Sequence, residues 1–123
     1  MNLLLDTHII LWWLSDASKL TLDHRNLLID INSICYISAV SIWEINIKSA
    51  IGKLTIPENY LDILKKQGFL ELPITWGHSH TVMQLPAFHS DPFDRMLIAQ
   101  AKVEDLTLLT VDDCIKKYNI KVR

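Results

Sequence analysis

The chain has 123 residues, half of them hydrophobic, with 12 basic and 14 acidic side chains and a formal net charge of −2. This length suits one domain, residues 1–123, built around a single sizeable core. The acidic excess argues weakly against a nucleic-acid partner, whose binding surface is usually basic. The total can mislead, however: if four acids held divalent cations, ten would remain against 12 basic groups, a balance of +2.

In chain order, short apolar runs alternate with helical patterns. The runs that predict strands are Asn2 to Leu5, Ser33 to Ser38, Phe69 to Pro73, Leu106 to Leu109 and, more weakly, Ile120 to Val122. The patterns that predict helices are His8 to Ser15, Leu22 to Ile31, Val40 to Ile51, Pro57 to Gln67, Thr75 to Gln84 and Pro92 to Glu104. Strands that alternate with helices predict an α/β fold in three layers, with a central, mainly parallel sheet of four or five strands.

The longest oily segment near the start, IILWWL, is too short to cross a bilayer, and no signal-type segment precedes it. We therefore expect no membrane association and a cytoplasmic location. Cys35 and Cys114 lie far apart and fit no CxxC pattern, so both are expected to be buried free thiols.

Three acidic residues are expected at one edge of the sheet. Asp6 directly follows the first predicted strand, Glu44 lies early in the helix after the second, and Asp112 begins the turn after the run that ends at Leu109. In an open parallel sheet, binding sites form beyond the carboxyl ends of the strands. The three carboxylates are therefore candidates for one site.

Helical periodicity points two acids toward the core. Glu44 shares its stripe with Val40, Ile47 and Ile51. In the helix after Pro92, Asp94 shares its stripe with Leu97, Ile98 and Ala101. Because a lone buried carboxylate is costly, such an acid needs a partner. If Asp6, Glu44, Asp94 and Asp112 converge, a hard divalent cation would relieve their repulsion, and Mg²⁺ and Mn²⁺ prefer oxygen ligands.

Each acid also has a purely structural interpretation. Ser41 to Glu44 and Thr110 to Asp113 both match a capping box, and Asp91 can be an N-cap with Asp94 in the first turn. Glu44 can further pair with Lys48 on a solvated surface. Under this alternative the protein is a non-catalytic binding module. A further candidate is a metal-dependent phosphate-ester hydrolase. However, an aspartyl-nucleophile enzyme normally has a second acid two residues after the first, where this chain has His8.

Other motifs point less clearly to function. His78, His80 and His89 have poor spacing for zinc. Arg95 and Lys102 share one side of a helix, where they either hold RNA phosphates or form a solvated basic face. Trp12 and Trp13 lie in a helix that is apolar nearly all round, so they pack either in the core or on a second chain, whereas Trp43 and Trp76 are expected in the core.

Five segments resemble PIN-domain proteins in order and spacing, and specifically the branch of VapC-type toxins. They are LLLDTHIILWWL, ISAVSIWEINIKSAIGKL, LPIT, HSDPFDRMLIAQA and LLTVDD, and together they run nearly from end to end of the chain. The resemblance implies a PIN-like fold and a Mg²⁺- or Mn²⁺-dependent endoribonuclease that cleaves RNA with a metal-activated water. It also implies the role of a toxin with a cognate antitoxin, and we expect a homodimer.

Carried over residue by residue, the resemblance makes Asp6, Glu44, Asp94 and Asp112 the metal-binding and catalytic acids. Asp113 competes with Asp112 for the fourth position. Thr110 matches a hydroxyl residue that orients a carboxylate or a water near that acid, and Thr110, Arg95 and Lys102 are the expected substrate contacts. Asp91 matches the motif of the branch but is expected to remain an N-cap.

Overall fold

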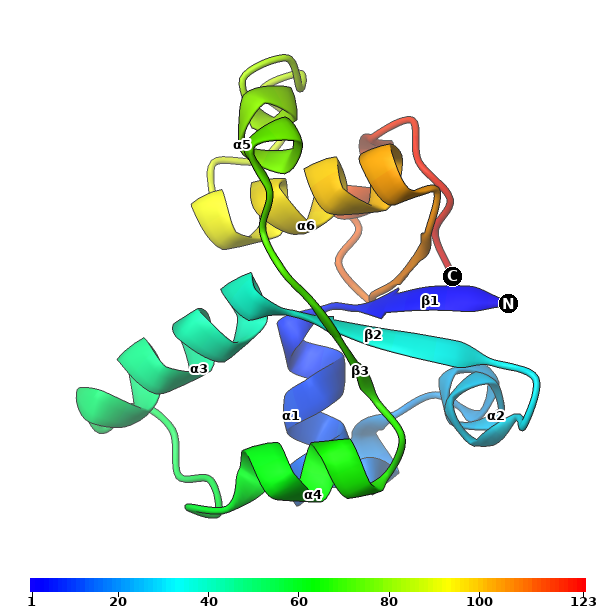
Figure 1. Cartoon of the computed structure of the whole chain (residues 1–123), viewed down its shortest axis with the longest axis vertical. Helices are drawn as coiled ribbons and strands as arrows, with labels where there is room; N and C mark the ends of the chain where they lie inside the picture. The colour runs from blue at the N-terminus through cyan, green and yellow to red at the C-terminus, as the bar shows by residue number, and fades with distance from the viewer.

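The strands are short, mainly apolar runs whose side chains alternate between the two faces of the sheet, and from Leu3 to Leu5 and from Thr107 to Leu109 the side chains are buried on both faces. The computed structural model describes all residues, 1–123. Its four strands are β1 (Asn2–Leu5), β2 (Ile34–Ser38), β3 (Leu70–Leu72) and β4 (Thr107–Leu109). All neighbouring pairs are parallel, and the order across the sheet is β3-β2-β1-β4 (Figure 1). All four carboxyl ends therefore point to one edge.

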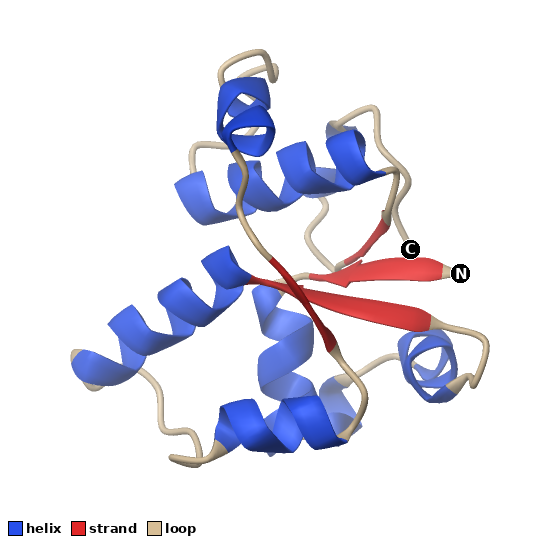
Figure 2. Ribbon diagram, viewed as in Figure 1, coloured by secondary structure: helices blue, strands red, loops and turns tan.

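Helices cover both faces of this sheet (Figure 2). They are α1 (Thr7–Ser15), α2 (Leu22–Ile29), α3 (Ala39–Ala50), α4 (Tyr60–Lys66), α5 (Trp76–Val82) and α6 (Pro92–Glu104), with short 3-10 turns at Ala17–Lys19 and Ile115–Lys117. Figure 1 shows α1, α2 and α4 on one side, α5 and α6 on the other, and α3 leaving the carboxyl edge. None of the helices has both the length and the apolar character of a transmembrane span.

The alternation of strand side chains produces two separate apolar clusters. Leu3 and Leu5 of β1 face the cluster that includes Ile9 and Ile10 of α1. Leu4, between them, faces the opposite cluster, which contains apolar residues of α6. A strand buried on both faces is what a continuous apolar run predicts. The predicted three-layer α/β fold is confirmed, with two clusters in place of the single core that was expected.

Two predicted boundaries were wrong. Pro57 lies in a turn, and α4 begins only at Tyr60. The segment Ile120 to Val122 forms no fifth strand, because it pairs with β4 through a single isolated bridge between Leu108 and Val122. Backbone hydrogen bonds from Leu108 to Lys121 and from Arg123 to Leu108 still hold the C-terminal segment along β4.

Both predicted capping boxes were wrong as well. Helix α3 begins two residues before Ser41, and its N-cap is Ser38, whose hydroxyl accepts from the Val40 N–H at 3.0 Å. Ser41 lies inside the helix, and its hydroxyl accepts a hydrogen bond from Thr7 of α1. No helix begins at Thr110, since the next helical turn starts at Ile115. Capping therefore does not explain the acids that follow Ser41 and Thr110.

Two tryptophans expected in the core lie on the surface. Trp43 is 60% exposed and Trp76 is 95% exposed. Trp43 packs edge-on against Phe93 of α6, with the ring centroids 5.4 Å apart. Trp76 is the first residue of α5 and points to solvent. Cys35 is a buried free thiol as predicted, but Cys114 is only partly buried.

Helix α6 has the entrance that the sequence predicts. The Asp91 carboxylate is the N-cap and accepts hydrogen bonds from the backbone N–H groups of Phe93, at 2.8 Å, and Asp94, at 3.2 Å. Pro92 occupies the first helical turn, where no backbone N–H is needed. This cap sets the position from which the Asp94 side chain projects.

Replacement of Asp91 by Ala removes the N-cap acceptor, and we expect the protein to lose about 1 kcal/mol of unfolding free energy. Asp91→Asn keeps a side-chain oxygen and should lose less. Urea unfolding of the wild type and both variants measures the difference. Equal stability of the Ala and Asn variants would contradict a capping role for Asp91.

Candidate metal centre

Asp6 directly follows β1 at the carboxyl edge of the sheet, at the N-cap position of α1, and is only 2% exposed. The Thr110 hydroxyl donates to one of its carboxylate oxygens, Oδ2, at 2.7 Å. The other oxygen, Oδ1, is buried and has no hydrogen-bond partner. Burial raises the pKa of Asp6, although the hydrogen bond from Thr110 opposes the rise.

Glu44 lies in the second turn of α3 and is buried, as predicted, although Ile47 and Ile51 of the same predicted stripe are exposed. Its Oε2 binds the Lys48 ammonium at 2.6 Å, while its Oε1 is buried without a partner. The pair with Lys48 was predicted as a solvated surface contact, but only the lysine end is exposed. The hydrogen bond to Glu44 raises the pKa of Lys48, so this ammonium stays charged beside the carboxylate.

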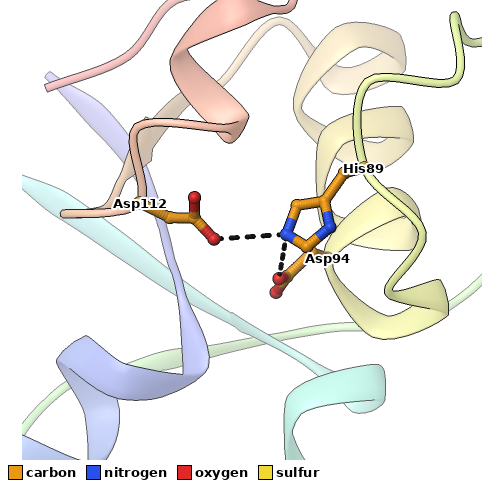
Figure 3. A group of neighbouring side chains, drawn as sticks. All are labelled: His89, Asp94 and Asp112. Atoms are coloured by element: carbon orange, nitrogen blue, oxygen red, sulfur yellow. Dashed lines mark hydrogen bonds and ion pairs between the residues drawn. The ribbon is translucent and has the colours of Figure 1, made fainter.

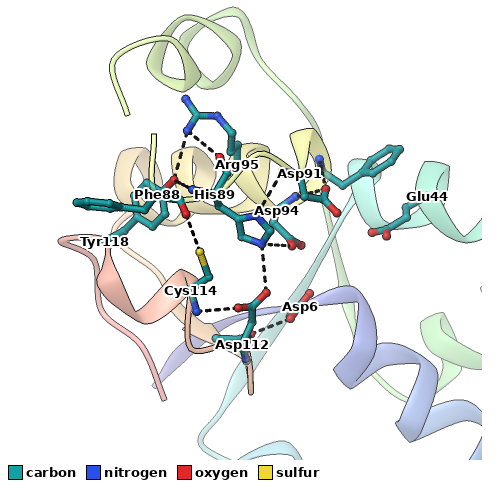
Figure 4. A network of polar contacts seen from close by, with 12 residues as sticks. Asp6, Glu44, Phe88, His89, Asp91, Asp94, Arg95, Asp112, Cys114 and Tyr118 are labelled. Atoms are coloured by element: carbon teal, nitrogen blue, oxygen red, sulfur yellow. Dashed lines mark hydrogen bonds and ion pairs between the residues drawn. The ribbon is translucent and has the colours of Figure 1, made fainter. Parts of the chain in front are cut away.

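Asp94 projects from the first turn of α6 toward the same region (Figure 4). The pKa of Asp94 is raised to about 7, mainly by burial and then by the negative charges of Asp6, Asp91 and Glu44, while the charge of His89 opposes the rise. Burial and nearby negative charges both disfavour the ionised form of a carboxyl group. The structure therefore brings Asp6, Glu44 and Asp94 into one electrostatic cluster.

Asp112 joins the cluster from the segment after β4. Burial opposes its ionisation, but hydrogen bonds from the Cys114 backbone N–H and the His89 ring outweigh that effect and lower the pKa of Asp112. Its own backbone N–H donates to the Thr110 hydroxyl at 3.0 Å. Asp113, the competitor in the sequence, points away, is 94% exposed and pairs with Lys116.

Sequence reasoning missed the part that His89 plays at this site. Its Nε2 lies 2.9 Å from Asp94 Oδ2 and 3.2 Å from Asp112 Oδ2 (Figure 3). One ligand atom from each of these three residues lies within 4.8 Å of the other two, close enough for a shared metal ion. The HSDP segment (His89 to Pro92) carried one usable signal: an imidazole placed just before a helix N-cap can fold back over the first turn.

Arg95 has contacts other than the RNA phosphates expected for it. Its guanidinium donates to the backbone carbonyls of Val82 and Pro86 at 2.9 Å, with longer bonds to Leu85 and His89. Val82 is the last residue of α5, and the other three acceptors lie in the loop between α5 and α6. Arg95 therefore holds that loop, and with it the backbone of His89.

Thr110 and Lys102 have different surroundings. Thr110 is buried and bound to Asp6 and to the Asp112 backbone, so its hydroxyl orients a carboxylate instead of facing a substrate. Lys102 lies exposed on α6, two turns beyond Asp94. It remains a predicted substrate contact.

The side-chain atoms that could bind a metal at this edge suit a hard divalent cation. Asp94 and Asp112 each place a carboxylate oxygen in the group that they form with His89, and two further carboxylate oxygens, on Asp6 and Glu44, are buried without a partner. A buried acceptor without a partner costs free energy, and carboxylate oxygen is the ligand type that Mg²⁺ and Mn²⁺ favour. The site also includes one ring nitrogen.

The family model of the PIN domain, a description of the sequences in that family, matches residues 3–121 of this chain. The chain belongs to the PIN domain family. A comparison of this PIN domain with curated protein sequences found no match.

Three solved structures share the fold of this PIN domain. The Rickettsia felis VapBC2 complex, bound to a DNA fragment from its promoter, aligns over 100% of this chain and 98% of the other, with 16% identity and a TM-score of 0.76. The FitAcB structure from Neisseria gonorrhoeae covers 98% and 95%, with 18% identity and a TM-score of 0.56. A FitAB structure with an IR36 DNA fragment covers 98% and 93%, with 16% identity and a TM-score of 0.54. At these identities the likeness shows the fold alone.

The raised pKa of Asp94 makes the stability of the metal-free protein depend on pH. The folded protein favours the protonated carboxyl, so the stabilisation is complete below the ordinary value of 3.8 and is lost as pH rises through about 7. In EDTA, wild-type stability should therefore fall between pH 4 and 8 relative to Asp94→Asn, whose side chain does not titrate. Thermal melts of both proteins across this range measure the difference. Parallel pH profiles would contradict the raised pKa.

Proposed function

We propose that this PIN domain is a Mg²⁺- or Mn²⁺-dependent endoribonuclease and the toxin of a toxin-antitoxin pair. Membership of the PIN family supports nuclease chemistry. The likeness to VapBC2 and FitAB, both solved with DNA, supports the toxin-antitoxin context. The acidic cluster supports metal dependence.

One set of observations supports the proposal: Asp94 and Asp112 lie with His89 in a group whose ligand atoms are within 4.8 Å of one another, and Asp94 also feels the charges of Asp6 and Glu44, each of which keeps a buried oxygen without a partner. The alternative of a binding module treats these acids as helix caps. Of the acids near the site, only Asp91 caps a helix with its side chain: Asp6 stands at the N-cap position of α1 without a side-chain cap hydrogen bond, α3 is capped by Ser38, and no helix starts at Thr110. A cation gives the remaining acids a physical reason to converge.

In this proposal Asp6, Glu44, Asp94 and Asp112 hold the cation, and Thr110 fixes the orientation of the Asp6 carboxylate. A bound divalent cation supplies an activated water and neutralises charge on the phosphate. Hydrolysis of this kind needs no 2′-hydroxyl nucleophile and leaves a 5′-phosphate and a 3′-hydroxyl. Lys102 is proposed to contact RNA phosphates on the α6 side of the site.

Loss of a residue that supports a metal ligand from behind costs roughly ten- to hundredfold in activity. Because Asp94 is proposed as a ligand itself, we expect Asp94→Asn to reduce RNA cleavage by more than this. Asp113→Asn is the matched control: it removes an equal charge from the solvent-facing position next to Asp112 and should keep activity. Total RNA incubated with Mg²⁺, Mn²⁺ or EDTA, and analysed on a denaturing gel, measures cleavage. A chromogenic phosphate monoester tested in parallel separates a ribonuclease from a general phosphate-ester hydrolase, which would hydrolyse the monoester and leave RNA intact.

The antitoxin is proposed to cover an open apolar groove beside the edge strand β3. Seven of its nine lining residues are hydrophobic, and they come from β2, α3, α4 and the start of β3. Leu61 and Leu70, at its rim, are largely exposed. An exposed apolar groove next to a sheet edge favours binding of an apolar segment from another chain.

Leu61→Glu should abolish binding of the antitoxin, because a carboxylate would have to be buried in the apolar contact. The antitoxin candidate is the product of a short open reading frame just upstream that encodes a small DNA-binding protein. Co-expression and affinity purification with a tag on the PIN domain measure binding. His80→Ala, an exposed change on α5, is the control. Undiminished co-purification of Leu61→Glu would place the antitoxin elsewhere.

The homodimer is also part of the proposal. Trp13 donates to Gln67 at 2.7 Å and packs edge-on against Phe69, so this side chain is used within the chain. Trp43, Ile47 and Ile51 remain exposed along α3. An apolar stripe on one helix is a surface that a second copy can bury.

A further inference from the structure

Hydrogen bonds to the backbone N–H and to the backbone carbonyl of His89 fix its position. The Tyr118 hydroxyl accepts from the His89 backbone N–H at 2.9 Å and itself donates to the Pro86 carbonyl at 2.9 Å. Arg95 donates to the His89 carbonyl and to Tyr118 Oη. Figure 4 shows this framework behind the imidazole. The ring therefore reaches Asp94 and Asp112 from a fixed loop.

The hydrogen bond to the other ring nitrogen selects a tautomer. The Asp91 backbone N–H donates to His89 Nδ1 at 3.3 Å, so Nδ1 is an acceptor and carries no proton. In the neutral ring the proton is then on Nε2, which points at the carboxylates of Asp94 and Asp112. A nitrogen that carries a proton has no lone pair for a metal, so in this arrangement His89 is a donor to the acids and not a cation ligand.

We propose that His89 is a positioning residue that takes the place of the cation in the metal-free protein. Its Nε2–H bridges Asp94 and Asp112 and keeps the two carboxylates together, and an entering cation displaces the ring from them. This inference rests on the proposed metal site. The ring is 18% exposed and the preceding residue, Phe88, is half exposed, so the ring lies near the surface, and its rotation toward solvent would break its hydrogen bond with the Asp91 backbone N–H.

The proposal has a thermodynamic consequence. Hydrogen bonds that exist only without the cation stabilise the metal-free state and therefore weaken cation binding by the same free energy. Removal of His89 should lower the melting temperature of the metal-free protein and tighten cation binding. If His89 were instead a cation ligand, its removal would weaken cation binding. The two roles predict opposite signs.

The experiment is a titration of metal-free protein with Mn²⁺ alone, in which electron paramagnetic resonance measures the free ion, together with thermal melts with and without Mn²⁺. We expect His89→Ala to bind Mn²⁺ about tenfold more tightly than the wild type, the effect of losing one charge-assisted hydrogen bond. It should also melt lower in EDTA. His89→Gln, which retains an N–H donor, should lie between the two, and His80→Ala should match the wild type.

Weaker Mn²⁺ binding by His89→Ala, or unchanged affinity with an unchanged metal-free melting temperature, would overturn the role of His89. The proposed metal site has its own control, Asp94→Asn, which should lose Mn²⁺ binding. If the wild type binds no Mn²⁺, or Asp94→Asn binds it as well as the wild type, the metal site itself is refuted. Failure of the site and failure of the His89 role are therefore distinguishable.

Discussion

The convergence of four carboxylates at the carboxyl edge of the sheet is the constraint on which the site depends. Asp6 and Glu44 are buried, and burial of Asp94, together with the charges of Asp6, Asp91 and Glu44, raises the pKa of Asp94 to about 7. Such crowding is unfavourable without compensating donors. The chain supplies Thr110 to Asp6, Lys48 to Glu44 and His89 to Asp94, and each donor satisfies part of a carboxylate. What remains unsatisfied is a set of oxygens that suits a cation.

The stretch from His89 to Arg95 concentrates several of these functions in one turn of chain. Asp91 caps α6, Asp94 projects into the acidic cluster, and Arg95 reaches back to hold the preceding loop. That loop presents His89 to the same cluster. Because these contacts share one segment, a change to the cap or to the Arg95 contacts should also disturb the metal site. The site is therefore coupled to the packing of α6 on the sheet.

A second region of the surface has a different chemistry. The apolar groove beside β3 contains one lysine and one glutamate among its lining residues, and it is distinct from the acidic edge. Trp43 connects the two regions, since it stands next to Glu44 in α3 and packs on Phe93, next to Asp94. A partner bound along α3 would contact the surface directly beside the site. This proximity gives a protein partner a physical route to block access to the acidic cluster.

Local patterns in the sequence predicted the layered α/β fold, the bounds of α6 and the inward direction of Glu44 and Asp94. Apolar alternation and helical periodicity depend on neighbours within a few residues, so they can be read directly from the chain. The same local reasoning was wrong for the capping boxes at Ser41 and Thr110. It was also wrong for Trp43 and Trp76, because an apolar residue type does not reveal which side of a helix finds a partner.

Only the tertiary structure decided which hydrogen-bond partners the acids have. The Thr110 hydroxyl binds Asp6 across 104 positions of sequence, and His89 lies between Asp94 and Asp112 because a loop held by Arg95 and Tyr118 folds over α6. The sequence by itself determined which carboxylates reach the sheet edge, since strand ends and helix stripes are local properties. It could not determine how those carboxylates are shared and satisfied, because hydrogen bonds between distant segments depend on the packing of the whole chain.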